Sequence, residues 1–299
     1  MCIQTQGGCA KTIADRSARA SRVKVSLRIG VGQPLMDDAT RLRLQDGAPR
    51  RAGEWRAKSL PPGERVYAVG DIHGRLDLLV EMQSLILNHA RLSPPRSVTV
   101  VWLGDYVDRG PSSRGVIDQL IAFSAGPLRS IFLMGNHEEA LLRFLIDPRN
   151  GHQWRSFGGL ATLISYGVDV TKFRLGRGAG KTRSDFLAAL PRAHQDFLLA
   201  LTFSCTIGDF FFCHAGVRPG VDLDKQHPQD LIWIRDEFLY SREDFGMMIV
   251  HGHTPVPEPE LRRNRVNIDT GAFATGRLTC AVIEGGEIGF LSTGRDVGA

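Results

Sequence analysis

Five short segments that combine glycine with aspartate, asparagine or histidine recur along this chain, and each directly follows a run of apolar residues. Together they hold five of its nine histidines. The segments are 70–74 (GDIHG), 104–110 (GDYVDRG), 135–138 (GNHE), 213–216 (CHAG) and 251–255 (HGHTP). Strand ends present functional side chains in α/β folds, and glycine lets the backbone bend tightly around them. One segment alone predicts little, but their recurrence predicts a single composite site.

The surrounding pattern is that of an α/β fold. From Val66 onward, short apolar runs alternate with amphipathic stretches. The expected strands of this half are 66–69, 97–103 and 131–134, and the expected helices are 76–89, 112–123 and 138–146. The run 97–103 is β-branched and nearly all apolar, so we expect this strand to be buried on both faces.

The regular spacing of apolar residues fades after Pro148, and a strand pattern appears in the final third of the chain. Residues 148–190, with a basic, glycine-rich stretch at 175–183, are expected to form either a partial lid or a surface excursion near the site. Helical patterns resume at 185–190 and 194–200. The later strands are expected at 203–207, 210–213, 247–250, 266–268, 278–283 and 288–291. These elements predict two facing sheets with helices outside.

The net charge of +5 is unevenly distributed. Residues 1–65 hold 13 Lys and Arg against 6 Asp and Glu, whereas residues 66–299 hold 24 against 26. A charged segment poor in periodic apolar residues is typical of a disordered extension. We therefore expect residues 1–64 to be a basic extension and residues 65–299 to form the folded domain. Met36 is an alternative start that would shorten the extension.

The chain has no predicted export or membrane segment. Its five cysteines are odd in number and lack CxxC spacing, which predicts neither a disulfide framework nor a zinc knuckle. No stretch approaches the ~18 consecutive apolar residues of a membrane span, and charges interrupt the region where a signal peptide would be apolar. We expect a cytoplasmic protein with no membrane partner. Nucleic acid is not an expected partner, because the basic charge belongs to the extension.

The donor atoms in the five segments suit divalent metal ions. Asp, Asn and His favour Mn²⁺, Fe or Zn²⁺ over a thiolate-bound metal. Two ions about 3.5–4 Å apart need an anionic bridge, and they lower the pKa of a bridging water towards ~7. We expect such a two-metal site here, with Mn²⁺ as the first choice of ion, and we expect it to attract phosphate.

The motifs GDIHG, GDYVDRG, GNHE, HAG and HGHTP resemble, in order and spelling, those of metal-dependent phosphoprotein phosphatases, within the calcineurin-like metallophosphoesterases. The resemblance covers roughly residues 65–291. It implies a four-layer αββα sandwich of two mixed β-sheets flanked by helices. It also implies the metal ligands: Asp71 and His73 on the first ion, Asp105 as the bridge, and Asn136, His214 and His253 on the second. His137 would protonate the leaving group, Asp108 would orient His137, and the bridging hydroxide would attack phosphorus in line.

Two arginines resemble the phosphate-binding residues of that family. They are Arg109 in GDYVDRG and Arg235, which follows Trp233. A guanidinium can pair with two phosphoryl oxygens and offset the charge that develops on them. For Arg109 the alternative is a structural ion pair with a nearby acid.

Other polar residues near the motifs are expected to be structural. The family places the ligand after glycine in HGHTP, so His251 is expected to support the ligands without binding metal. Asp269 is expected to brace loops, and Glu138 to begin and cap a helix. Pro255 stands where related phosphodiesterases and nucleases carry a further histidine, which favours a phosphatase-like site.

Two features of the excursion have competing interpretations. Residues 176–182 (GRGAGKT) end like a phosphate-cradling GxxxxGK[ST] loop, but Leu175 stands where the first glycine belongs. We expect a plain surface loop there, with a basic lid as the alternative. Trp154 and Phe157, beside a glycine pair, are expected either to line a substrate pocket or to anchor a loop on the core.

The expected function is hydrolysis of phosphomonoesters, on a phosphoprotein (Ser/Thr or Tyr) or a small substrate. Met134 precedes Gly135 where eukaryotic members have Arg, and no SAPNYC-like stretch follows, so the chain resembles the bacterial and Rhizobiales-like branch. The alternative is a diadenosine-tetraphosphatase-like hydrolase that cleaves a phosphoanhydride, for which ADP is the expected product. A third hypothesis is a silent module that binds nucleic acid or an anionic membrane through the basic extension. Nothing in the sequence predicts an oligomeric state.

Overall fold

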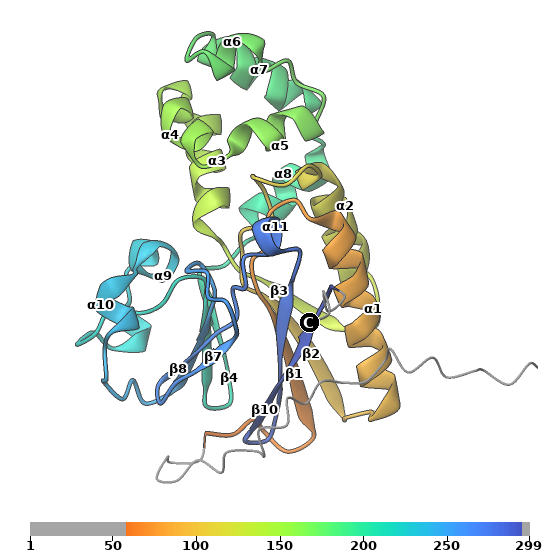
Figure 1. The fold of residues 1–299 in the computed structure, drawn as a ribbon, viewed down its shortest axis with the longest axis vertical. Coiled ribbons are helices and arrows are strands. Elements are labelled where there is room, and N and C mark those ends of the chain that lie inside the picture. Colours follow the sequence, from red (N-terminus) through yellow and green to blue (C-terminus); the bar gives the residue numbers. More distant parts are fainter. Residues whose placement is uncertain (1–57, 295–299) are drawn as a thin grey trace, which may run out of the picture. The chain divides into compact units, whose positions relative to one another are not determined.

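The computed structural model describes residues 58–294, and its strands form two five-stranded β-sheets (Figure 1). The first sheet has the order β10-β9-β1-β2-β3. These strands are Glu287–Ser292, Thr279–Glu284, Glu64–Val69, Ser97–Trp102 and Arg129–Phe132. β1, β2 and β3 are parallel, whereas β9 and β10 are antiparallel to their neighbours. Residues 1–57, with Met36 and most of the predicted extension, lie outside the described residues.

The second sheet has the order β4-β5-β6-β8-β7. These strands are Ser204–Ile207, Phe210–Cys213, Met248–His251, Arg265–Asn267 and Glu260–Leu261. β5, β6 and β8 are parallel, and β4 and β7 pair antiparallel at the two edges. Both sheets are therefore mixed, as the resemblance implied.

A helix follows each of the first three strands, and the first two of these helices lie along one face of the first sheet (Figure 1). The three helices are α1 (Leu76–Leu92), α2 (Ser113–Ser124) and α3 (Asn136–Ile146). The later part of the chain, after β5, adds the 3₁₀ turn η3 (Leu223–Lys225) and the helices α9 (Pro228–Trp233), α10 (Asp236–Leu239) and α11 (Ala272–Thr275). α1 buries Leu79, Met82 and Ile86, whose spacing of three and four residues places them on one helix face. The three helices predicted in the first half are confirmed.

Side-chain alternation along the strands builds four layers. In β1, Val66 lies in an apolar cluster with Phe212 of the second sheet, whereas Tyr67 lies in the cluster that contains residues of α1 and α2. Phe211, beside Phe212, packs instead with Phe238 of α10. Each sheet thus has one face on the other sheet and one on helices, which confirms the αββα sandwich.

The segment after Pro148 is more helical than we predicted. It forms η2 (Pro148–Asn150), α4 (Gly151–Ser156), α5 (Gly159–Ser165), α6 (Thr171–Arg174), α7 (Ala179–Ala189) and α8 (Arg192–Leu199). α4 and α7 pack against α3, and α5 packs against α2. We expected a plain surface loop over residues 176–182 (GRGAGKT). This is wrong from Ala179 onward, because α7 begins at Ala179, directly after Gly178 with φ of 69°. Lys181 pairs with Asp185 one turn later, so it does not form part of a phosphate cradle.

The third strand lies two positions earlier than predicted. β3 pairs with β2 from Arg129 to Phe132, whereas the sequence pattern indicated 131–134. Leu133 instead forms an isolated parallel bridge with Thr202, and the Met134 amide donates to the Thr202 carbonyl at 2.7 Å. The apolar run therefore continues beyond the strand, because its last residues pair with the segment that leads into the second sheet. No helix within residues 58–294 is long and apolar enough to span a membrane.

Candidate active site

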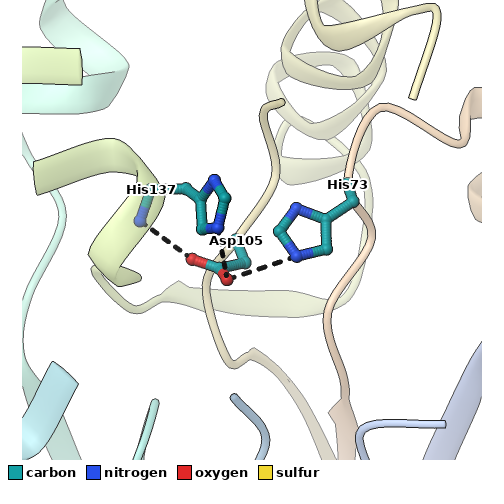
Figure 2. A group of neighbouring side chains, drawn as sticks. All are labelled: His73, Asp105 and His137. Atoms are coloured by element: carbon teal, nitrogen blue, oxygen red, sulfur yellow. Dashed lines mark hydrogen bonds and ion pairs between the residues drawn. The ribbon is translucent and has the colours of Figure 1, made fainter. Parts of the chain in front are cut away.

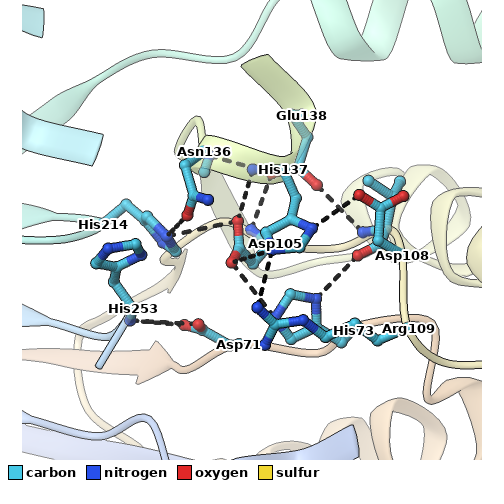
Figure 3. A network of polar contacts seen from close by, with 12 residues as sticks. Asp71, His73, Asp105, Asp108, Arg109, Asn136, His137, Glu138, His214 and His253 are labelled. Atoms are coloured by element: carbon cyan, nitrogen blue, oxygen red, sulfur yellow. Dashed lines mark hydrogen bonds and ion pairs between the residues drawn. The ribbon is translucent and has the colours of Figure 1, made fainter. Parts of the chain in front are cut away.

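The five motifs converge because each one follows the carboxyl end of a parallel strand, β1, β2, β3, β5 or β6. Figure 3 shows their side chains gathered around Asp105. The side chains placed there are Asp71, His73, Asp105, Asp108, Arg109, Asn136, His137, Glu138, His214 and His253. Apart from Arg109, which is exposed, all of these residues are buried. The sequence therefore predicted correctly which segments meet.

The backbone at this centre is strained. Within residues 58–294, the non-glycine residues with positive φ are His73 (46°), Asp105 (52°), Asp108 (72°), Arg109 (64°) and His253 (66°). Left-handed conformations of such residues cost about 1–3 kcal/mol each and persist where the surrounding structure enforces them. All five belong to the predicted site. This indicates that the strained backbone, which lowers the stability of the fold, is what orients these side chains.

Asp105 is the shared member of two side-chain clusters, the first of which is drawn in Figure 2. In the first, Asp105 Oδ2 lies 3.4 Å from His73 Nε2 and 3.8 Å from His137 Nε2. In the second, Asp105 Oδ1 lies 3.4 Å from His214 Nε2, and His253 completes the group. Both oxygens of one carboxylate thus face separate groups of donors, which is the arrangement that a bridging ligand requires.

The histidines present ring nitrogens to this centre. His73 Nδ1 donates to the Val107 carbonyl at 2.9 Å, which leaves His73 Nε2 with a free lone pair. His214 Nδ1 donates to the Leu103 carbonyl at 2.9 Å; burial opposes a second proton on this ring, but the Asp105 and Asp71 carboxylates raise its pKa to about 10, so Nε2 is also protonated in the absence of metal. The Nε2 atoms of His73 and His253 are buried without a hydrogen-bond partner among the described residues. Burial lowers the pKa of His73 to about 3 and of His253 to about 2, which keeps both rings neutral.

Asn136 and Asp71 complete the surroundings of Asp105. The Asn136 Oδ1 atom lies 2.9 Å from His214 Nε2. Asp71 stands outside the two clusters and accepts from the His253 amide, with both carboxylate oxygens at 3.2 Å. Burial raises the pKa of Asp71 well above its usual value, and the nearby Asp269 carboxylate acts in the same direction. The centre therefore holds more buried negative charge than its side chains neutralise.

His137 and Asp108 form an oriented pair next to the clusters. His137 Nδ1 donates to Asp108 Oδ2 at 2.7 Å, and Arg109 donates to His137 Nε2 at 3.1 Å. Burial alone would lower the pKa of His137, but the Asp105 and Asp108 carboxylates outweigh it and raise the pKa. The two carboxylates thus favour a second proton on His137, which Nε2 can take only when Arg109 no longer donates to it.

Asp108 is itself held by two residues of the helical segment, and the sequence analysis missed this role. Trp154 Nε1 donates to Asp108 Oδ2 at 3.0 Å, and Thr162 Oγ1 donates to Asp108 Oδ1 at 2.6 Å. Trp154 is fully buried, so it anchors its helix on the core and does not line a pocket. The adjacent glycine pair marked a tight turn, but no motif in the sequence linked α4 and α5 to Asp108.

Removal of the Trp154 donor should slow catalysis without unfolding the protein. Trp154→Phe keeps an aromatic ring against Phe144 and Phe186, but leaves Asp108 with one donor fewer. We expect kcat to fall about tenfold, or ~1.4 kcal/mol, with KM nearly constant. Trp102→Phe is the matched control, because Trp102 is also fully buried but its Nε1 has no partner among the described residues. Equal losses in the two variants would show a packing effect only.

Glu138 organises the backbone of two motifs. Its Oε1 accepts from the amides of Tyr106 (2.8 Å) and Val107 (3.1 Å), and its Oε2 accepts from those of Asp105 (2.8 Å) and Gly135 (3.1 Å). The bond to Gly135 caps α3, as the sequence predicted, while the other three fix the loop after β2. Burial raises the pKa of Glu138 to about 7, with the Asp105 charge acting in the same direction.

Glu138→Gln should therefore destabilise the fold. The new amide group would point N–H donors at amides that need an acceptor, so we expect the free energy of unfolding to fall by about 2–3 kcal/mol. Glu139→Gln is the control, since Glu139 pairs with Arg143 of the same helix and, among the described residues, holds no loop amide. Chemical denaturation of both variants tests this, and equal stability of the two would refute the bracing role.

The remaining predicted residues lie around the centre. Arg235 is exposed at the start of α10, and its charge helps to lower the pKa of His253, an effect dominated by burial. His251 is buried against the Phe238 ring, outside both clusters. Asp269 Oδ1 accepts from the Gly271 amide at 2.9 Å, which is the loop contact that we expected.

Comparison with known proteins agrees with this geometry. The model of the calcineurin-like phosphoesterases matches residues 64–275. The chain belongs to this family. Its curated relatives include asymmetrical bis(5'-nucleosyl)-tetraphosphatases PrpE from Anoxybacillus flavithermus and from Halalkalibacterium halodurans, each 27% identical over 230 residues, which cover 71% of this chain and 87% of the relative. A crystal structure described as a candidate diadenosine tetraphosphatase matches with a TM-score of 0.53 at 20% identity, over 79% of this chain and 97% of that one; this likeness shows the fold alone.

Calcineurin-like phosphoesterases typically bind two divalent metal ions, and the residues present here fit such ions. The lone pairs of His73 and His253 have no partner among the described residues, and Asp105 faces both clusters. The buried carboxylates Asp71 and Asp269 also lack a neutralising arginine or lysine in contact with them, as far as residues 58–294 show. Divalent cations would satisfy the lone pairs and the excess charge together.

Proposed function

We propose that this phosphoesterase hydrolyses a phosphoanhydride bond of a dinucleoside tetraphosphate. The observation that carries the hydrolytic chemistry is the pair of clusters that share Asp105, beside the His137–Asp108 pair. The choice of substrate is supported by the relatives named bis(5'-nucleosyl)-tetraphosphatase. This reverses the order of our two hypotheses from the sequence, in which phosphomonoester hydrolysis came first.

We propose that the metal ligands are Asp71, His73, Asp105, Asn136, His214 and His253, with Mn²⁺ as the first choice of ion. When bound, the ions polarise phosphoryl oxygens and supply a hydroxide nucleophile at neutral pH. The chain's own residues bind and orient the substrate around that centre. Asp105 would supply a negative charge to both metal ions, because it is the residue common to both clusters.

Arg109 and His137 would act in sequence on the substrate. The exposed Arg109 donates to His137 Nε2 at 3.1 Å. A phosphoryl group bound by the guanidinium would draw Arg109 away and free Nε2 to carry a proton towards the leaving oxygen. Asp108 holds the opposite ring nitrogen, and so fixes the direction of Nε2. Arg235 would contact the phosphate chain from the α10 side.

Phosphomonoester hydrolysis remains the second proposal, because the His137–Asp108 pair favours it. A phosphate leaving group ionises with a pKa near 6 and needs little help from an acid, whereas an alkoxide needs a proton. A positioned acid is therefore more useful for esters than for anhydrides. For either substrate class, we propose a cytoplasmic location, supported by Cys205, Cys213 and Cys280, which form no disulfide with one another within residues 58–294.

A substrate panel tests the proposed function. Purified Mn²⁺-loaded protein is assayed on diadenosine tetraphosphate and on phosphoserine, phosphothreonine and phosphotyrosine peptides, with chromatographic identification of the products. Asymmetrical cleavage, as in the names of the relatives, would release ATP and AMP in place of the ADP that we first expected. We predict a higher kcat/KM for the dinucleotide. Intact dinucleotide with rapid turnover of a phosphopeptide would overturn the proposal in favour of the second.

A further inference from the structure

Phe273 is an exposed aromatic residue in direct contact with the catalytic centre. It is 39% exposed and lies outside the three buried apolar clusters of the described residues. Its ring meets the His73 ring edge-on, with 5.4 Å between the centroids. The Arg109 guanidinium carbon lies 4.6 Å from the centroid of the same ring. Phe273 thus touches a proposed metal ligand and the proposed phosphate clamp, and still presents surface to solvent.

The short helix α11, which carries Phe273, is held by several hydrogen bonds. α11 is bounded by Gly271 and Gly276, with φ of 68° and 74°. Thr275 Oγ1 donates to the Thr270 carbonyl at 2.9 Å, and Arg75 donates to the Ala272 carbonyl at 2.9 Å. A fixed aromatic surface loses little conformational entropy when a ligand binds. The structure therefore holds a partly exposed aromatic ring in a fixed position outside the buried apolar clusters.

A second pair of aromatic rings contacts one histidine of each cluster. The rings of Phe157 and Trp233 are 5.5 Å apart. Phe157 lies 5.8 Å from His137, and Trp233 lies 6.1 Å from His253. Both residues are half-buried. Because Phe273 adjoins His73 and Trp233 adjoins His253, aromatic rings border both of the clusters that share Asp105.

We propose that Phe273 is a stacking platform for a nucleobase of the substrate. The proposal rests on the proposed function only in taking the substrate to contain a nucleoside. A phosphate held by Arg109 would place the attached nucleoside within reach of the ring that Arg109 covers. Every nucleobase has a flat π-face, and one stacking contact is worth about 5- to 150-fold in affinity. A platform of this kind accepts different bases, because stacking does not read their edges.

Direct binding tests the platform without any need for turnover. Calorimetry on the full-length, Mn²⁺-loaded protein compares two non-hydrolysable probes, adenosine 5′-(α,β-methylene)diphosphate and methylenediphosphonate, which differ by the nucleoside. The readout is the ratio of their affinities. We expect the wild type to prefer the nucleoside probe by about tenfold or more, and Phe273→Tyr to keep that preference. Phe273→Leu, which keeps an apolar side chain against Arg109 and His73 but lacks a π-face, should reduce it to about twofold.

Two results would overturn the platform: equal affinity of the wild type for both probes, or a preference that Phe273→Leu retains. Thermal melting of the Tyr and Leu variants checks that both are folded. The outcome is separable from the proposed function. Binding that depends on the ring, in a protein that leaves diadenosine tetraphosphate intact, would refute the function and support the platform. Cleavage of the dinucleotide, together with binding that does not depend on the Phe273 ring, would support the proposed function and refute the platform.

Discussion

Asp105→Asn is expected to abolish hydrolysis and metal binding together, with a loss of about 10³-fold or more in kcat/KM. Asp105 is the member common to both clusters, and its two oxygens face His73 and His214 at 3.4 Å each. The amide keeps the shape but removes the charge that a bridge must supply. It also aims N–H groups at one of the two clusters. Metal content by mass spectrometry and hydrolysis rate should therefore fall in parallel.

The matched control is Asp185→Asn, because Asp185 makes a surface pair with Lys181 on α7. This variant should keep its metal and its activity, since exposed pairs contribute at most about 1 kcal/mol to stability. Two bound ions and full activity in Asp105→Asn would show that Asp105 is not the bridge.

His137→Asn is expected to keep its metal and to lose activity according to the leaving group. On phosphoserine peptides we expect a loss of about 10²–10⁴-fold, the usual contribution of a positioned acid. On diadenosine tetraphosphate the loss should be far smaller, because the departing phosphate is stable as an anion. Rates on both substrates, with metal content as the control, measure the difference.

An equal loss on the two substrates would argue that His137 acts otherwise than as an acid. The first cluster offers the alternative, because His137 Nε2 lies 3.8 Å from Asp105 Oδ2. If His137 were a metal ligand, the Asn variant would lose metal together with activity on every substrate. The metal measurement therefore separates the two roles.

Much of the fold followed from local patterns. β5 was predicted with its observed bounds, Phe210–Cys213, because an apolar run flanked by polar residues limits it on both sides. β3 was misplaced because its apolar run also serves the bridge from Leu133 to Thr202, a contact between segments far apart in the sequence. α6 and α11 are four residues long, so no helical period could reveal them.

The centre of the site was predictable because its residues lie within short motifs, each beside a strand end. The supporting residues were not. Thr162 reaches Asp108 only because α5 packs against α2, and Phe273 reaches Arg109 only through the loop after β8. Such contacts depend on the tertiary structure and leave no spacing to detect. The motifs describe the metal chemistry that the two substrate classes share, so they do not rank one class above the other.

The central claim is that two metal ions on these residues drive cleavage of a dinucleoside tetraphosphate. The most direct test is titration of metal-stripped, full-length protein with Mn²⁺, while bound metal and release of ATP and AMP from diadenosine tetraphosphate are followed together. We predict no turnover without metal and maximal turnover near two equivalents. Turnover in the stripped protein, saturation at one equivalent, or an intact dinucleotide at full metal occupancy would contradict the claim.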